Sequence, residues 1–184
     1  MLNPEQRKKL LEIARSTIER ALLGHRAETD DAELDESLKA PSGVFVTLRT
    51  HAGDLRGCIG SLHPVAPLYQ AVSSNAINAA FRDPRFHPLK ADEIGAIEIE
   101  ISVMGPIESV GNTEEIVVGR DGLIVSRGRD AGLLLPQVAT EYGWDRETFL
   151  RQTCVKAGLP PDTWRAGDCH IEKFSAEVFG EEEP

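Results

Sequence analysis

The stretch Val44-Phe45-Val46-Thr47-Leu48-Arg49, followed by Leu55-Arg56-Gly57-Cys58-Ile59, decides the fold of this 184-residue chain. Its first half is rich in β-branched and aromatic residues, which favour strands. Ala52-Gly53-Asp54 lies between the two halves and is a typical turn sequence. The stretch therefore predicts a β-hairpin whose second strand carries Cys58.

The segments around this hairpin predict a sheet with helices packed on it. Residues 96–104 alternate isoleucine or valine with Glu98, Glu100 and Ser102, which indicates a half-buried strand. Apolar residues recur at helical spacing over about 67–81, and a last strand is expected over 170–179. Hairpin, helix, strands, helices and strand in this order are typical of an α+β fold with a mainly antiparallel sheet.

The chain is expected to form a single domain with four regions. Asn3, Pro4 and Gln6 form a helix-start signal, and the N-terminal helix should extend over 1–24. Residues 25–40 are acidic and predict a loop or a short solvated turn. Residues 41–180 should form the α/β core, followed by a tail over 181–184.

Three further expectations concern local structure. Asp83-Pro84-Arg85-Phe86-His87-Pro88 predicts an extended, rigid loop, because a proline disfavours helix at the residue before it. Residues 117–126 predict a second hairpin that turns at 119–122, with a short strand at 132–135. Helices are expected over 136–142 and 145–157.

Composition limits the classes of partner. Hydrophobic residues make up 41% and charged residues 27%, the balance of a globular protein, and the formal net charge is −10. Such a charge opposes binding to nucleic acid and to anionic membranes. No apolar run approaches the roughly 20 residues of a membrane span, and the N-terminus resembles neither a signal peptide nor a lipidation site. Three widely spaced cysteines argue against a disulfide framework, so a cytoplasmic location is expected.

The strand around Cys58 holds the main candidate site. Gly57 and Gly60 flank the thiol and would expose main-chain amides able to hold a substrate or an oxyanion. Arg56 shares a face with Cys58 in a regular strand, and its guanidinium would raise the thiolate fraction. The alternative interpretation is that Cys58 is an ordinary core residue and that the glycines serve packing alone.

A second group of candidates follows the predicted helix. Asp83 and Arg85 stand on either side of Pro84, where a carboxylate and a guanidinium of fixed direction could bind a substrate. They could equally pair with each other or cap the helix. His63 could serve Cys58 as a general base, or it could be a solvent-facing turn residue.

The pattern of metal-binding residue types predicts neither a metal site nor a cofactor. Cysteines, histidines and carboxylates do not recur at the usual ligand spacings. Cys154 falls on one helical face with Phe149 and Leu150, which indicates a core residue.

The eight residues Leu55-Arg56-Gly57-Cys58-Ile59-Gly60-Ser61-Leu62 resemble the signature of the AMMECR family. The resemblance continues through Gly43–Leu48, Ala80–Phe86, Glu98–Ser102, Leu133–Val138, Gly143-Trp144, Phe149-Leu150 and Cys154–Leu159. It implies two α/β lobes around a shared antiparallel sheet, with a cleft lined by the signature. It also implies Memo-like and radical-SAM proteins as partners. The biochemical activity of the family is not established.

Two functions follow from these observations. In the first, the protein is a thiol-dependent enzyme acting on a small or anionic substrate. Cys58, Arg56 and His63 are then the catalytic candidates, and Gly57, Gly60, Asp83 and Arg85 are the substrate-binding candidates. In the second, it is a non-catalytic module that binds a small-molecule ligand or a partner. A purely structural domain is a third interpretation, and the sequence predicts no oligomeric state.

Overall fold

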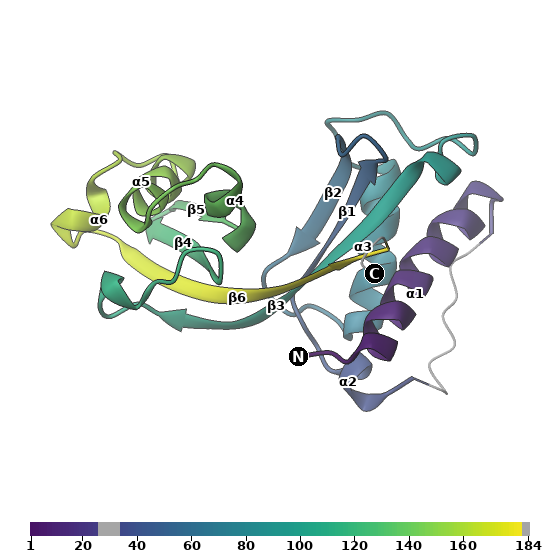
Figure 1. The fold of residues 1–184 in the computed structure, drawn as a ribbon, viewed down its shortest axis with the longest axis horizontal. Helices are drawn as coiled ribbons and strands as arrows, with labels where there is room; N and C mark the ends of the chain where they lie inside the picture. Colours follow the sequence, from purple (N-terminus) through teal and green to yellow (C-terminus); the bar gives the residue numbers. More distant parts are fainter. Residues whose placement is uncertain (26–33, 182–184) are drawn as a thin grey trace. The chain divides into compact units, whose positions relative to one another are not determined.

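The computed structural model describes residues 1–25 and 34–181. Six strands form one sheet in the order β2-β1-β3-β6-β4-β5 (Figure 1). The strands are β1 (Val44–Thr50), β2 (Leu55–Ser61), β3 (Ile97–Ser109), β4 (Asp121–Arg127), β5 (Asp130–Leu134) and β6 (His170–Gly180). The pairs β1–β2, β1–β3, β4–β5 and β4–β6 are all antiparallel. The expected α+β fold with a mainly antiparallel sheet is confirmed.

The chain divides into two compact units, each with its own hydrophobic core. The first contains the described residues of Met1–Met104 and Glu177–Pro184, and the second is Gly105–Ala176. Strands β3 and β6 each contribute residues to both units.

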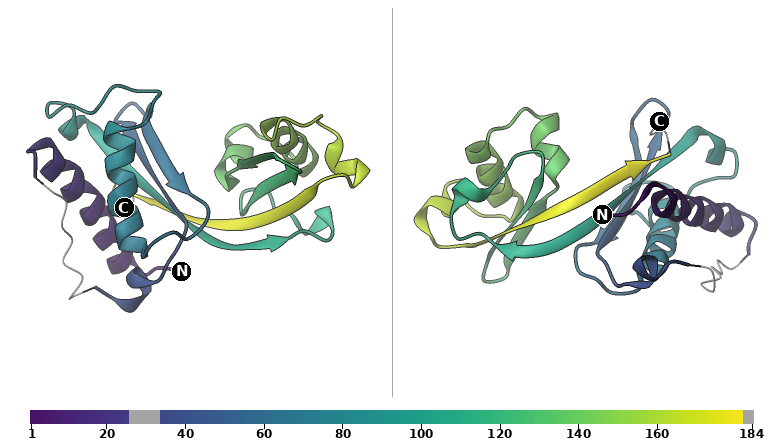
Figure 2. Two further views of the ribbon diagram at one scale, coloured as in Figure 1. Left: turned by 180° about the vertical axis from the view of Figure 1, so that it is seen from behind. Right: turned by 60° about the horizontal axis from the view of Figure 1, so that its bottom comes forward.

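Helices α1 (Pro4–Leu22) and α3 (Leu68–Phe81) of the first unit pack on one face of strands β1, β2 and β3 (Figures 1 and 2). The helices contribute buried Leu10 and Val72 to this core, and the strands contribute Val46 and Ile99. Because side chains alternate across a strand, the residues between these core positions face away from the helices. Thr47 and Cys58 are two such residues, so the Cys58 side chain lies on the face without helices.

A capping box and a buried leucine shape the N-terminal segment of the chain. Asn3 and Gln6 form the expected capping box at the start of α1. The expected loop over 25–40 is corrected in part, because Glu36–Lys39 form a short helix, α2, whose N-cap is Asp35. Leu38 anchors α2 in the core, and this burial overrides the acidic composition. Residues 26–33 of the expected loop lie outside the described part.

The second unit contains helices α4 (Pro136–Glu141), α5 (Arg146–Lys156) and α6 (Thr163–Ala166) and the hairpin β4–β5. The expected hairpin over 117–126 is wrong, since β4 begins at Asp121 and turns between Arg127 and Asp130. Gly128 takes a positive φ of 63° in that turn. Arg120 and Asp121 instead form an ion pair at the start of β4. Cys154 is fully buried on α5, as expected.

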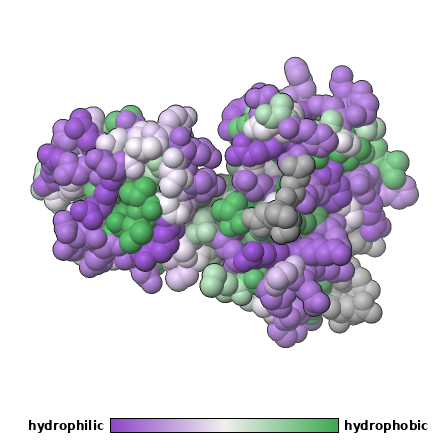
Figure 3. Space-filling view, in the orientation of Figure 1, coloured by the Kyte–Doolittle hydropathy of each residue, from purple (hydrophilic) through white to green (hydrophobic). Residues whose placement is uncertain are grey.

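Two short 3-10 helices, η1 (Ile94–Ala96) and η2 (Thr113–Glu115), complete the elements of the described residues. Figure 3 shows polar residues over most of the face seen there, with apolar patches of limited extent. None of the described helices has both the length and the apolar character needed to cross a membrane.

Candidate functional site

The Cys58 thiol lies half-buried on the face of strands β1–β3 opposite to α1 and α3. Thr47 is directly opposite Cys58 in the β1–β2 pair, so the two side chains share that face. The Thr47 hydroxyl donates a hydrogen bond to Cys58 Sγ at 3.3 Å.

The main chain of Cys58 is held by the loop that follows α3. Strand β2 forms one edge of the sheet, where every second residue turns its N–H and C=O outward. The Cys58 N–H donates to Asp83 Oδ2 at 2.9 Å, and Arg85 Nη2 donates to the Cys58 carbonyl at 3.1 Å. Two charged side chains thus take the place of a neighbouring strand and fix the peptide that carries the thiol.

Asp83 and Arg85 also bind each other. Arg85 Nε donates to Asp83 Oδ1 at 2.9 Å, and Arg85 Nη2 donates to Oδ2 at 2.7 Å. The Arg85 hydrogen bond holds the pKa of the Asp83 carboxyl far below its ordinary value, and the Cys58 N–H acts in the same direction. Asp83 in turn raises the pKa of Arg85. Of the roles left open for these residues, mutual pairing is the one observed.

The loop between α3 and η1 differs from the expected extended shape at its start. The Phe86 N–H donates to the Asp83 carbonyl at 3.1 Å, which closes a turn over 83–86. Pro84 occupies the second position of that turn, where its fixed φ is favourable. The turn brings the Asp83 carboxylate and the Arg85 guanidinium to the same side, next to β2.

The Arg56 side chain lies in an ion pair with Glu93 instead of beside the thiol. Leu48 pairs with Gly57 and Arg49 pairs with Leu55, so Arg56 is the extra residue of a β-bulge. A bulge redirects the side chain of the extra residue. Arg56 Nε and Nη2 donate to the two Glu93 carboxylate oxygens, at 2.9 and 3.1 Å. The guanidinium that contacts Cys58, through its carbonyl oxygen, belongs to Arg85.

Close packing requires both glycines of the motif. A Cβ on Gly57 would lie 2.2 Å from the Ala79 carbonyl oxygen of α3. A Cβ on Gly60 would lie 2.4 Å from the Phe45 ring and from the Val44 carbonyl oxygen. The glycines let α3 and Phe45 approach β2.

His63 lies beyond the end of β2 and is exposed. Its carbonyl accepts a hydrogen bond from Ser61, and among the described residues its imidazole has no hydrogen bond or ion pair. Sequence reasoning missed Thr47 and Glu93. Counting across a regular hairpin from Arg49 and Leu55 would place Val46 opposite Cys58, and only the bulge at Arg56 moves Thr47 there. No sequence signal links Glu93 to Arg56.

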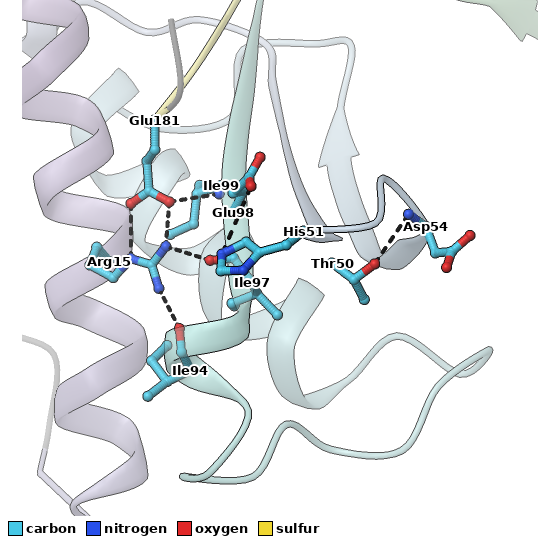
Figure 4. A network of polar contacts seen from close by, with 9 residues as sticks. All are labelled: Arg15, Thr50, His51, Asp54, Ile94, Ile97, Glu98, Ile99 and Glu181. Carbon is cyan, nitrogen blue, oxygen red and sulfur yellow. Dashed lines mark hydrogen bonds and ion pairs between the residues drawn. The ribbon is translucent and has the colours of Figure 1, made fainter.

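Two of the pockets that the described residues form lie in the first unit. The first, of about 400 Å³, is lined by Arg56, Arg85, Phe86, His87, Pro88, Lys90, Asp92 and Glu93. The second, of about 440 Å³, is lined by Arg15, Glu19, His51, Ile94, Gly95, Ile97, Glu98 and Glu181. In the second pocket, the Arg15 guanidinium already donates hydrogen bonds to Glu181 and to the carbonyls of Ile94 and Ile97 (Figure 4). The first is therefore the better candidate for a ligand.

The other two cysteines have different surroundings. Burial raises the pKa of the Cys154 thiol and of the Cys169 thiol, so both stay protonated near neutral pH. Within the part of the chain that the structure describes, no three cysteine, histidine or carboxylate side chains gather as a metal site.

Comparison with known proteins gives consistent results. The sequence model of the AMMECR1 family matches residues 11–179. A protein of Pyrococcus furiosus is 48% identical over 184 residues, covering 95% of this chain and 88% of that protein. A protein of Methanothermobacter thermautotrophicus is 45% identical, with 98% and 97% covered. The crystal structure of an uncharacterized protein from Pyrococcus horikoshii matches with a TM-score of 0.91 and 43% identity, covering 100% of this chain and 95% of that one.

Proposed function

The chain belongs to the AMMECR1 family, and from the geometry around Cys58 we propose that it is a thiol-dependent enzyme acting on a small substrate. The observation that carries the proposal is the hydrogen bond from Thr47 Oγ1 to Cys58 Sγ, 3.3 Å long. Thr47 is buried, so water competes little for this hydroxyl, and the bond holds the sulfur in a fixed position for attack on a substrate.

The fixed main chain of Cys58 supports the same proposal. A nucleophile acts efficiently when its position is set before the substrate arrives. Asp83 and Arg85 hold the N–H and C=O of Cys58 from one side, and β1 holds the neighbouring residues from the other. In this proposal Asp83 and Arg85 are positioning residues.

The proposed step uses an electrophilic carbon of the substrate. The thiol proton passes to solvent, and a sulfur lone pair forms a bond to that carbon. The electron pair of the bond that breaks departs with the leaving group, which takes up a proton. Water then cleaves the S–C bond, its hydroxyl going to carbon and a proton returning to sulfur.

Alkylation rates test the proposal. Cys58 should react with iodoacetamide at pH 7 faster than the buried Cys154, as followed for each cysteine by peptide mass spectrometry. Thr47→Val keeps nearly the same shape and removes the hydroxyl, so it should slow the reaction of Cys58. Thr17→Val is the matched control, because Thr17 is buried and its hydroxyl bonds to Ser73.

A Cys58 that reacts no faster than Cys154, or whose rate ignores Thr47→Val, would reject the thiolate nucleophile. Unfolding of the Thr47→Val protein is checked by circular dichroism. If that variant is unfolded, Thr47→Ser replaces it, and the hydroxyl of serine should preserve the fast reaction.

A binding module that works with Memo-like and radical-SAM proteins is the second candidate function. It is favoured by the packing roles of Gly57 and Gly60, because these roles explain the motif without a catalytic role for Cys58. The test is a titration of this protein with the purified Memo-like and radical-SAM proteins of the same organism. Submicromolar binding that survives Cys58→Ser would support the module, and absence of binding to both proteins would reject it.

A further inference from the structure

Two guanidinium groups lie on the Phe86 ring. Arg56 Cζ is 6.0 Å from the ring centroid and Arg85 Cζ is 5.5 Å from it. These distances are those of cation–π contacts. The β2 bulge and the turn after α3 therefore bring Arg56 and Arg85, which are distant in sequence, to the same aromatic side chain.

Each guanidinium is fixed through the same two nitrogens. Arg56 uses Nε and Nη2 for Glu93 and for the His87 carbonyl. Arg85 uses Nε and Nη2 for Asp83 and for the Cys58 carbonyl. Such two-point pairing holds a planar guanidinium in a set direction.

The third nitrogen of each group makes no hydrogen bond among the described residues. Arg56 Nη1 is buried and has no hydrogen-bond partner among the described residues. Arg85 Nη1 makes no hydrogen bond within the same residues, and the Arg85 side chain is 53% exposed. A buried donor without an acceptor costs free energy, so an incoming oxygen that satisfies it binds favourably.

These groups border the pocket of about 400 Å³ described above, which is large enough for a small organic molecule. Exposed Lys90 adds a third cation, and Phe86 and Pro88 add apolar surface. Asp92 and Glu93 also line the pocket, and the whole chain carries a net charge of −10. Both facts oppose a polyanion and favour a ligand with one small anionic group.

We propose that this pocket binds a small organic molecule that carries one oxyanion group, a carboxylate or a phosphate. The oxyanion lies near the Nη1 atoms of Arg56 and Arg85 and near the Lys90 ammonium. The apolar part of the ligand lies against Phe86 and Pro88. The pocket takes this ligand without any reaction at Cys58.

The test is an NMR titration of the whole ¹⁵N-labelled protein with benzoate, phenyl phosphate and benzamide. Benzoate or phenyl phosphate should shift the amide signals of 85–93 and the Arg56 and Arg85 Nε–H signals, whereas uncharged benzamide should leave them in place. The anion that binds more tightly identifies the oxyanion as carboxylate or phosphate. The proposal is overturned if neither anion shifts these signals at 20 mM, or if benzamide binds as well as benzoate.

Three variants locate the binding. Arg56→Lys keeps the charge but loses the guanidinium, and it should weaken binding about tenfold, the effect of one charge-assisted hydrogen bond. Lys90→Gln, an exposed substitution that preserves the fold, should weaken it severalfold. Lys9→Gln, at an exposed position of α1, should leave it unchanged. Equal affinity of all three variants for the anion would reject the assignment to this pocket.

Cys58→Ser separates this proposal from the proposed enzyme. That variant should bind the anion as the natural protein does, because the Cys58 side chain is not part of the pocket lining. The enzyme is tested by alkylation of Cys58 in the natural protein and the pocket by the anion titration. Success of one measurement and failure of the other therefore shows which of the two proposals has failed.

Discussion

The Asp83 carboxylate accepts a hydrogen bond from the main-chain N–H of Cys58 at 2.9 Å, although the two residues lie on different elements. The Asp83 side chain is 1% exposed and is balanced by Arg85. The contact joins the turn after α3 to the edge strand of the sheet. An edge strand whose polar groups are taken by charged side chains is also protected from pairing with another chain.

Asp83→Asn should lower the free energy of unfolding by about 2 kcal/mol, because it removes the charge of a buried carboxylate that accepts hydrogen bonds from half-exposed Arg85 and from the Cys58 N–H. Arg85 would then lose its counter-charge, and the Cys58 N–H would lose its charged acceptor. Urea unfolding followed by circular dichroism measures the change. Asp54→Asn, at an exposed turn position, is the control and should change stability little. Equal stability of both variants would contradict the structural role of Asp83.

The same ion pair predicts a pH dependence of stability. Folding lowers the pKa of Asp83, so the folded protein binds its proton less readily than the unfolded chain. The stabilisation is therefore fully present above about pH 4, the ordinary range of an aspartate, and is lost as the pH falls through the lower folded-state pKa. The difference in unfolding free energy between the natural protein and Asp83→Asn should be constant from pH 7 to 5 and shrink below pH 4. A difference in unfolding free energy that grows as the pH falls would contradict this prediction.

Gly57→Ala should destabilise the protein by at least about 2 kcal/mol, because the new methyl group meets the main chain of α3 and cannot turn away from it. Gly95→Ala is the matched control. It lies in the same unit, and no atom is within 4 Å of the position that its Cβ would occupy. Thermal unfolding measures both variants. Two variants of equal melting temperature would show that α3 can move away from β2 at little cost.

Glu181→Gln should lower the free energy of unfolding by about 1 kcal/mol. Glu181 accepts hydrogen bonds from Arg15 Nε and from the Ile99 N–H, both at 2.8 Å, and so ties the end of β6 to α1 and β3 (Figure 4). The effect should decrease in 1 M NaCl, because salt screens partly exposed ion pairs. Glu12→Gln, at an exposed position of α1, is the control in the same urea titration.

The sequence predicted those elements whose signal is local. The capping box of Asn3 and Gln6 and the alternation along β3 were both correct, since each depends on neighbours within a few residues. The second hairpin was placed wrongly. Two glycine-containing turns follow one another there, and only pairing with β5 and β6 decides which of them closes the hairpin.

The candidate site also contains residues that were predicted correctly and one whose position depends on tertiary pairing. Cys58, Asp83 and Arg85 were named from the sequence, and the structure brings these three together. Arg56 was expected beside the thiol because a regular strand was assumed. The bulge turns it to Glu93 instead, and a bulge depends on how β2 meets β1.

The sequence by itself determined the first hairpin, the long helices and the position of Cys58 on the second strand of that hairpin, because periodicity and capping are local properties. Tertiary structure alone decided which charges meet. Arg56 with Glu93, Asp83 with the Cys58 amide, and both arginines with Phe86 are contacts between separate elements. Their formation depends on the register of the strands and on how closely α3 approaches the glycines of β2, and that distance is set by packing in three dimensions.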